Sequence, residues 1–242
     1  MALALFIAAS PVSAEDLVSG LSQDTIQITS NYTGTDIVVF GAIERAEDTA
    51  GRDIVVIVRG PDAPMVVRRR DRIAGIWVNR DSATFKGLPS YYFLASTQKV
   101  DKIASPETLE RYGIGLENLE PDSVQSHHNA EPFRQALLRR QERAHLYIEA
   151  PQGVEFLSNT LFRVRVPVPA TVPRGQYNAE VYLFRGGTVI SAQSTPLFID
   201  QTGLERRLFN FAHARPLYYG LSTVLMAGLL GWLSSVIFRR AG

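Results

Sequence analysis

The amino-acid sequence predicts a mainly β protein: an immunoglobulin-like β-sandwich (one or two) with a short helical insertion, plus one C-terminal transmembrane helix. Short β-rich runs separated by turn residues, over 24–97 and 145–199, favour the sandwich. The segment 217–238 contains no charged side chain and is followed directly by Arg239 and Arg240. Since about 20 apolar residues cross the hydrocarbon core of a bilayer once, this segment predicts a single membrane span.

The first β block alternates β-rich runs with turn residues. Ile and Val are concentrated at 37–43 and 54–58, which predicts two central strands that are covered on both faces. The block comprises the runs TIQITS, DIVVFGAIE, DIVVIVRG, MVVRR, IAGIWVN and SYYFLAST.

The second β block has a clearer periodicity. Apolar and polar side chains alternate over 161–168, which predicts one core face and one solvent face. Gly186 and Gly187 can supply the positive φ values of a tight hairpin turn. The stretch 173–177 is typical of the approach to the penultimate strand of an immunoglobulin-like sandwich, where a tyrosine packs at the corner.

Helices are predicted between and after the β blocks. Ser105 as the N-cap, Pro106 at the first helical position and Gly113 at the end predict a short helix. A second helix is predicted over 130–144, so that the helical insertion covers about 105–144. A third, over 203–214, has Leu and Phe spaced for one face and would rest on a lipid interface.

The two ends of the chain predict its location. Residues 1–14 have the apolar core and the small-residue ending of a signal peptide, although the usual positive charges before it are missing. We therefore expect residues 15–200 to be exported, 201–216 to be juxtamembrane, 217–238 to span the membrane and 239–242 to be cytoplasmic. This places the protein in a bacterial inner membrane, with the bulk of the chain in the periplasm.

Composition excludes several classes of function. A formal net charge of +1 gives no bulk attraction to nucleic acid, and the absence of cysteine removes thiol catalysis and cysteine-ligated zinc. We find no sequence motif for hydrolysis or phosphate binding, so no enzymatic activity and no cofactor is expected. His127, His128 and Glu131 could supply metal ligands, but a polar loop before a helix explains them better, and no metal is expected.

Two groups of residues are candidates for contact with a partner or an anion. Arg68, Arg69, Arg70 and Arg72 could bind oxyanions, although a solvated hairpin end explains the same pattern. The aromatic residues of the first block could form a protein-binding surface, although packing in the core predicts them equally. They are Trp77, Tyr91, Tyr92 and Phe93, and simple alternation predicts that at least one of the last three is exposed.

The predicted span carries small side chains along one face. Gly220, Ala227, Gly231 and Ser235 recur at helical spacing, and small residues allow a second helix to approach closely in lipid. The frequent occurrence of such residues in spans would explain the stripe equally well. No Asp, Glu, Lys, Arg or His lies within 217–238, so this helix alone is not an ion path.

Several phrases taken together resemble an alphaproteobacterial transmembrane protein family. They are Arg59-Gly60-Pro61, the basic stretch running into AGIWVN (74–79), PSYYFLAST (89–97), LFRVRV (161–166), VPRGQYNAEVYLFRGG (172–187), GLERR (203–207) and YYGLSTVLMAGLLGWL with the closing Phe238-Arg239-Arg240. The resemblance implies a signal sequence, an exported domain and one C-terminal span. It implies no catalytic residue, and it suggests association with permeases of the sulfite-exporter type.

These observations lead to one principal hypothesis and one alternative. The first is a non-enzymatic accessory or interaction subunit, integral to the membrane by a single span, which binds a polytopic membrane protein or a second copy of itself through the transmembrane helix. The alternative is a periplasmic sensor or binding module for a small anion, which would use the arginines at 68–72.

Overall fold

The chain divides into two compact units, which are described separately. The first comprises residues 1–26 and 33–200, and the second comprises residues 27–32 and 201–242. The computed structural model describes residues 16–28, 32–44, 51–73, 75–126, 129–201, 213 and 216–239. The predicted signal peptide at 1–14 lies outside the described residues, as does the predicted amphipathic helix at 203–214 except for His213.

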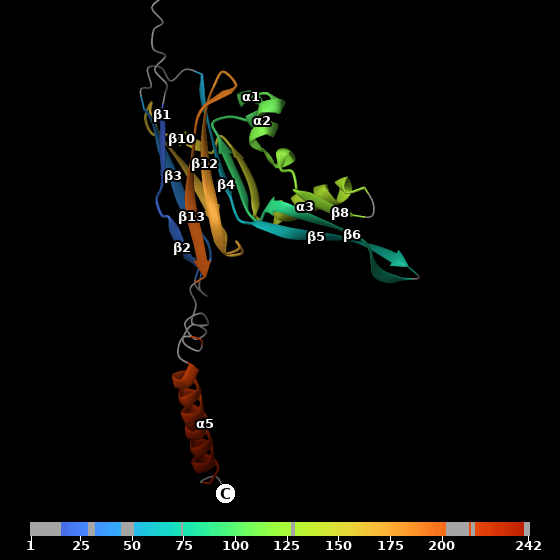
Figure 1. The fold of residues 1–242 in the computed structure, drawn as a ribbon, viewed down its shortest axis with the longest axis vertical. Coiled ribbons are helices and arrows are strands. Elements are labelled where there is room, and N and C mark those ends of the chain that lie inside the picture. The colour runs from blue at the N-terminus through green and yellow to red at the C-terminus, as the bar shows by residue number, and fades with distance from the viewer. Residues whose placement is uncertain are drawn as a thin grey trace, which may run out of the picture. The chain divides into compact units, whose positions relative to one another are not determined.

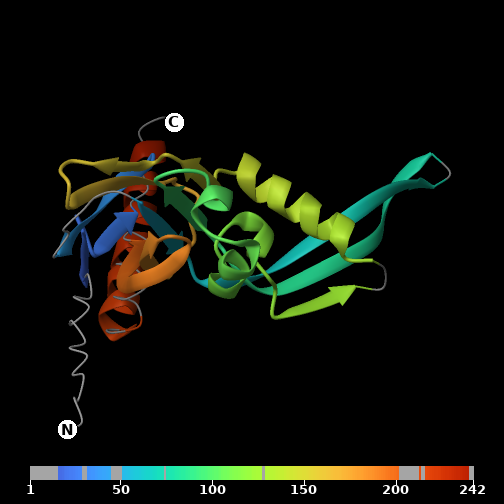
Figure 2. The same ribbon diagram turned by 90° about the horizontal axis from the view of Figure 1, so that it is seen from above.

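Two large β-sheets dominate the structure, so the prediction of a mainly β fold is confirmed (Figures 1 and 2). One has the strand order β1-β3-β11-β10 and the other β2-β13-β12-β4-β7-β9. The strands are β1 (Asp16–Leu21), β2 (Thr25–Ile28), β3 (Thr35–Glu44), β4 (Arg52–Arg59), β7 (Tyr92–Ser96), β9 (Tyr147–Pro151), β10 (Val154–Phe156), β11 (Leu161–Val168), β12 (Gly175–Arg185) and β13 (Thr188–Gln201).

The two predicted central strands differ in their burial. In β4, all five residues from Ile54 to Val58 are at most 2% exposed, so both faces of this strand are covered as predicted. In β3, Ile37 and Val39 are buried, whereas Phe40 is 44% exposed. The prediction that 37–43 is covered on both faces is therefore wrong, because one face of the four-stranded sheet is open to solvent at Phe40.

Strand β11 shows the alternation that its sequence predicts. Phe162, Val164 and Val166 are buried, while Arg163 and Arg165 lie on the outer face. Phe162 lies opposite Gly41 of β3, and a Cβ atom at Gly41 would stand only 2.5 Å from Cζ of the Phe162 ring. A glycine is therefore required at position 41 for this ring to occupy the core.

Tyrosine side chains hold the ends of the two sheets together. The Tyr177 hydroxyl donates a hydrogen bond to the Pro173 carbonyl at 2.6 Å, which is the predicted corner. The Tyr91 hydroxyl donates to the Pro167 carbonyl of β11 at 2.5 Å, and the Tyr91 and Tyr177 rings are 5.9 Å apart. The predicted hairpin turn is also confirmed, with φ values of 55° and 85° at its two glycines.

A long insertion between β4 and β10 builds a second hydrophobic core. Its own sheet has the order β5-β6-β8, and it also contributes β7 and β9 to the six-stranded sheet. The second core joins Val55 and Ile57 of β4 to Phe85 of β6 and Leu137 of α3. The insertion's other elements are β5 (Asp62–Ile73), β6 (Ile76–Pro89), α1 (Val100–Ile103), α2 (Pro106–Tyr112), η1 (Leu116–Asn118), β8 (Ser123–Ser126) and α3 (Glu131–Arg143).

The insertion is thus larger than the predicted helical segment at 105–144. Helices α2 and α3 of the insertion form where they were predicted: the Ser105 hydroxyl accepts from the Thr108 N–H, and Gly113 ends α2 with φ of 60°. The sequence does not reveal the third sheet, because the β-rich runs within β5 and β6 indicate strands without indicating which sheet they join. The second core explains why β4 and β7 of the six-stranded sheet are covered on both faces.

Helix α5 (Pro216–Arg239) forms where the membrane span was predicted. Its described side chains, at 216–217 and 219–233, are all exposed, including Leu217 at 86% and Val224 at 70%. Within the described residues, no helix combines the length and the apolarity that a membrane span requires. The predicted span therefore stays a prediction.

Candidate functional site

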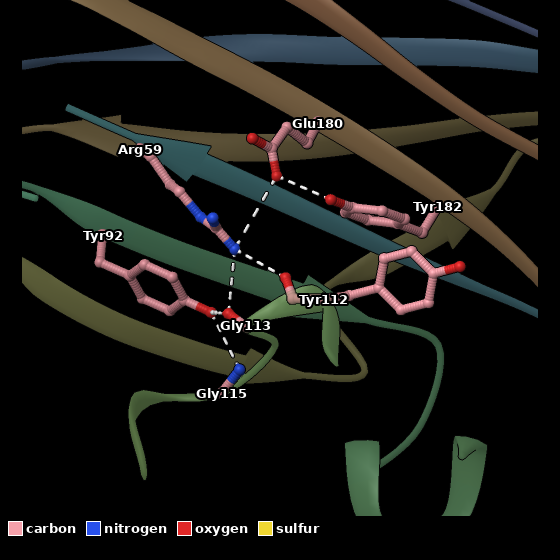
Figure 3. A network of polar contacts seen from close by, with 7 residues as sticks. All are labelled: Arg59, Tyr92, Tyr112, Gly113, Gly115, Glu180 and Tyr182. Carbon is pink, nitrogen blue, oxygen red and sulfur yellow. Dashed lines mark hydrogen bonds and ion pairs between the residues drawn. The ribbon is translucent and has the colours of Figure 1, made fainter. Parts of the chain in front are cut away.

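Arg59 lies at the centre of a polar network at the end of strand β4 (Figure 3). Its Nη2 atom donates hydrogen bonds to the carbonyl oxygens of Tyr112, at 3.0 Å, and Gly113, at 2.9 Å. These carbonyls are at the C-terminal end of α2, where unpaired carbonyl groups and the helix dipole favour a cation. The guanidinium group therefore fastens α2 to the six-stranded sheet.

Glu180 of β12 supplies the negative charge in this network. Its Oε2 atom lies 3.8 Å from Nη2 of Arg59 and accepts a hydrogen bond from the Tyr182 hydroxyl at 2.9 Å. The Tyr182 ring meets the Tyr112 ring edge to face, at 5.6 Å between centroids. The carboxylate thus compensates the charge of Arg59 and holds Tyr182 beside it (Figure 3).

Tyr92 binds the same loop from the other side of Arg59. Its hydroxyl accepts from the Gly115 N–H at 2.9 Å and lies 3.4 Å from the Gly113 carbonyl, to which it donates. The guanidinium carbon of Arg59 is 6.0 Å from the centre of the Tyr92 ring. Burial raises the pKa of Tyr92 well above its ordinary value, so the phenol stays neutral in the folded protein.

Several buried tyrosines make folding sensitive to high pH. Burial raises the pKa of Tyr92, Tyr147, Tyr177 and Tyr182 above the ordinary value of about 10. Above that pH the unfolded chain loses these protons while the folded chain keeps them. The free energy of unfolding should therefore be unaffected below about pH 10 and fall above it, by up to about 1.4 kcal/mol per pH unit for each such tyrosine.

Urea unfolding followed at a series of pH values checks this dependence, with the ultraviolet absorbance of tyrosinate recorded in parallel. Tyr182→Phe should flatten the decrease above pH 10, because one of the groups is removed. Appearance of tyrosinate absorbance in the folded protein, before unfolding begins, would contradict the expected protection.

The Arg59 network forms one wall of a polar cleft of about 770 Å³. Arg59 and Arg111 are the cations of its lining, and Asp62, Glu110, Glu120 and Glu180 are the anions. An anionic ligand would meet more carboxylates than guanidinium groups, and Nη2 of Arg59 is already bonded to two carbonyls. The remaining lining consists of Gly60, Pro61, Gly87, Pro89, Tyr112, Gly113, Asn118, Leu119, Gln176 and Asn178.

This arrangement is suited to holding elements together and offers no anion site. Among the described residues, no group of three or more His, Cys, Asp or Glu side chains could hold a metal ion. His127 and His128, which the sequence offered as ligands, lie outside the described residues. Sequence reasoning missed Arg59 as a site residue, although a charged residue that ends the apolar run at 54–58 was a usable signal.

The predicted arginine cluster and Trp77 come together on the β5–β6 hairpin. The register places Arg72 opposite Trp77 and Arg70 opposite Asn79. Trp77 is 67% exposed and its neighbour Ile76 is 69% exposed. Arg69 forms an ion pair with Asp81, and Arg80 forms one with Asp71 at 3.1 Å. The arginine side chains at 68, 69, 70 and 72 are all exposed.

Tyr91 and Tyr92 do not belong to this surface. Tyr91, Tyr92 and Phe93 are at most 2% exposed, so the prediction that at least one of the three is exposed is wrong. Alternation along β7 sends successive side chains to opposite faces, and both faces are covered here: one by the sandwich core and one by the second core. Tyr91 and Tyr92 therefore stabilise the interior and cannot contact a partner.

The predicted packing face of α5 is open. Gly220, Ala227 and Gly231 are exposed, and a Cβ atom added at Gly220 or Gly231 would meet no atom within 4 Å. The side chain of Ser235 lies outside the described ones. The face is thus available to another helix in the three positions that the structure describes.

Comparison with known protein families finds one whose model matches most of the chain. The model of the family described as "Putative transmembrane protein (Alph_Pro_TM)" matches residues 16–240. The chain belongs to this family. Of the phrases that carried the resemblance to it, those at 59–61, 89–97 and 172–187 contain Arg59, Tyr92, Glu180 and Tyr182, all four from the polar network.

Comparison with other proteins adds little. Comparison with curated protein sequences finds no match. Among solved structures, AggA, the major subunit of aggregative adherence fimbriae type I from Escherichia coli, matches at a TM-score of 0.25 and 11% identity. The match covers 77% of this chain and 93% of AggA.

Proposed function

We propose that the protein is a non-enzymatic accessory subunit of a bacterial inner-membrane complex, with an immunoglobulin-like periplasmic domain and a single membrane anchor formed by α5. The observation that carries this proposal is the exposure of the apolar side chains of α5, whose one charged residue, Arg239, lies at its end. The described side chains of α5 all face solvent, and 217–238 contains no Asp, Glu, Lys, Arg or His. Such a helix is stable only when lipid or another helix covers it.

The immunoglobulin-like assignment is supported by strand order. In that fold one sheet has the order A-B-E-D and the other has G-F-C. With β1, β3, β11 and β10 as A, B, E and D, and β13, β12 and β4 as G, F and C, both orders are matched. The hydrogen bond from Tyr177, near the start of strand F, to Pro173 adds the corner that is common in this fold.

The membrane location is supported by the name of the family and by the charge pattern. The family is described as a transmembrane one, and Arg239 and Arg240 follow the apolar segment directly. Positive charges flanking a span favour the cytoplasmic side, which leaves the β domain in the periplasm.

A partner helix is the best occupant of the face formed by Gly220, Ala227 and Gly231. Association of helices in lipid depends on close packing of small side chains, since lipid tails are as apolar as leucine. We propose a polytopic permease as the partner, and the sulfite-exporter type that the family resemblance implies is the first candidate. A second copy of this chain is the other possible occupant.

Replacing Ala227 and Gly231 with leucine should dissociate this complex. The added side chains would hold the two helix axes apart, so recovery of the partner should fall roughly tenfold or more. The tagged full chain is purified from its native membrane in mild detergent, and the co-purifying protein is identified by mass spectrometry. Ser222→Leu with Leu229→Phe adds bulk on the opposite side of α5 and serves as the control.

The outcome separates the possible partners. A polytopic protein that is recovered with the wild type and the control but not with Ala227→Leu/Gly231→Leu supports the proposal. Chemical crosslinking that yields only a homodimer would assign the face to self-association. Equal recovery of the partner with all variants would refute a role for this face.

The alternative, a periplasmic sensor or binding module for a small anion, has less support. Small-anion sites usually place donors in a concave, partly buried setting, whereas the side chains of Arg68, Arg70 and Arg72 are exposed on a hairpin. Arg69 is also engaged by Asp81.

A further inference from the structure

The largest exposed apolar side chains of the β5–β6 hairpin belong to the first residues of β6, directly after the turn that joins the two strands. Ile76, Trp77 and Val78 are 69%, 67% and 43% exposed. The hairpin extends well past α3 and β8, the elements that cover its base (Figures 1 and 2). Because these three residues are successive in one strand, each face of the hairpin end carries apolar side chains, with Arg72 beside Trp77 on one face and Asp71 beside Val78 on the other.

Basic side chains are concentrated directly behind this tip. Between residues 66 and 82 the hairpin has arginines at 68, 69, 70, 72 and 80 against aspartates at 71 and 81. The whole chain has a formal net charge of only +1, so the positive charge is localised here. Arg69 is paired with Asp81 and Arg80 with Asp71, so the excess positive charge resides on Arg68, Arg70 and Arg72.

The register of β5 and β6 determines how far each arginine lies from the tip of the hairpin. Residues directly opposite in an antiparallel pair share a face, so Arg72 lies on the same face as Trp77, and Arg70 follows two residues behind. With a rise of about 3.4 Å per residue, Arg70 is about 7 Å and Arg68 about 14 Å farther from the tip than Arg72. The headgroup region on one side of a bilayer is roughly 5–7 Å thick, so Arg72 and Arg70 would lie within it when the tip reaches the acyl chains.

We propose that the tip of the β5–β6 hairpin docks on a bilayer surface that contains anionic lipid. Ile76, next to the turn, enters the apolar boundary, and Trp77 and Val78 occupy the interface, where indole rings are favoured. Arg70 and Arg72 bind lipid phosphates, which carry the complementary charge. A bilayer surface accepts a narrow hairpin end that carries apolar and basic side chains together, whereas a protein partner would need a groove shaped to it.

Trp77 itself can report this contact. The chain has two tryptophans, so Trp232→Phe leaves Trp77 as the single indole fluorophore. The purified full chain is reconstituted into vesicles of phosphatidylcholine alone or of phosphatidylcholine with phosphatidylglycerol. Part of the phosphatidylcholine is brominated to quench a membrane-inserted indole, and iodide is added to quench a water-exposed one. No other protein is present, so the result does not depend on the partner of α5.

Trp77 should be quenched by brominated lipid and protected from iodide in the anionic vesicles only. Added salt should reverse the effect, because it screens the attraction. Arg70→Glu/Arg72→Glu should lower the fraction of chains whose Trp77 is inserted roughly tenfold, and Arg70→Gln/Arg72→Gln should have a smaller effect in the same direction. Arg139→Glu/Arg143→Glu on α3 makes the same change in charge at exposed positions away from the tip and should leave binding unchanged.

Three results would overturn the proposal. In the first, Trp77 stays accessible to iodide in both kinds of vesicle. In the second, brominated lipid quenches Trp77 equally in both kinds of vesicle, which would exclude charge complementarity. Protection that appears only when a membrane-protein extract is added would assign the tip to a protein partner. Glycerophosphoglycerol without a bilayer should give no protection, which separates a surface from a free headgroup.

Discussion

Replacing Phe162 with alanine is expected to destabilise the β domain by about 3–5 kcal/mol. The ring is fully buried, lies against Gly41 and meets the Phe156 ring edge to face at 6.4 Å between centroids. Gly41 has no side chain that could move into the space left by the ring, so the substitution should leave a cavity. Urea unfolding of the full chain in mild detergent measures the loss.

Phe40→Ala provides the matched control. Phe40 lies in the neighbouring strand of the same sheet, but it points to the open face and is 44% exposed. Its removal should cost at most about 1 kcal/mol, since surface substitutions usually have small effects. Similar losses for the two variants would mean that the sheet is not covered on the Phe162 side.

Replacing Arg59 with leucine is expected to cost about 2–4 kcal/mol. The change removes the donor to two carbonyls at the end of α2 and leaves the Glu180 carboxylate without its counter-charge. Hydrogen bonds that involve a charged group contribute about 1.5–3 kcal/mol each, and the 29% exposure of the Arg59 side chain reduces the total by partial solvent screening. Hydrogen exchange of the α2 amides should accelerate together with the fall in global stability.

Arg111→Leu tests whether this loss is specific to the network. Arg111 lines the same cleft and carries the same charge, but its side chain is exposed. Its replacement should change stability by no more than about 0.5 kcal/mol. Equal effects of the two substitutions would indicate that net charge in the cleft, and not the bonds of Arg59, stabilises α2.

The sequence predicts local features well where one or two residues decide them. Ser105, Pro106 and Gly113 set both ends of α2, and Gly186 with Gly187 sets the hairpin between β12 and β13. Each of these depends on backbone geometry within a few residues, which a single sequence contains. The alternation over 161–168 similarly decides which face of β11 is buried.

Features that depend on a distant layer could not be predicted in the same way. Both β3 and β4 are rich in Ile and Val, yet only β4 contributes to the second core. Tyr91, Tyr92 and Phe93 are all buried for the same reason, which alternation alone does not reveal. The network of Arg59, Glu180 and Tyr92 joins residues from separate strands, and no local pattern brings them together.

Strand β4 serves two cores at once, and this has a mechanical consequence. Its side chains at 54, 56 and 58 point away from those at 55 and 57, and both sets are buried. The insertion between β4 and β10 is therefore packed directly on a strand of the six-stranded sheet, and a force applied to the insertion is transmitted to that sheet through β4. A single cooperative unfolding event under load, without a separate release of the insertion, is the behaviour that such a construction implies.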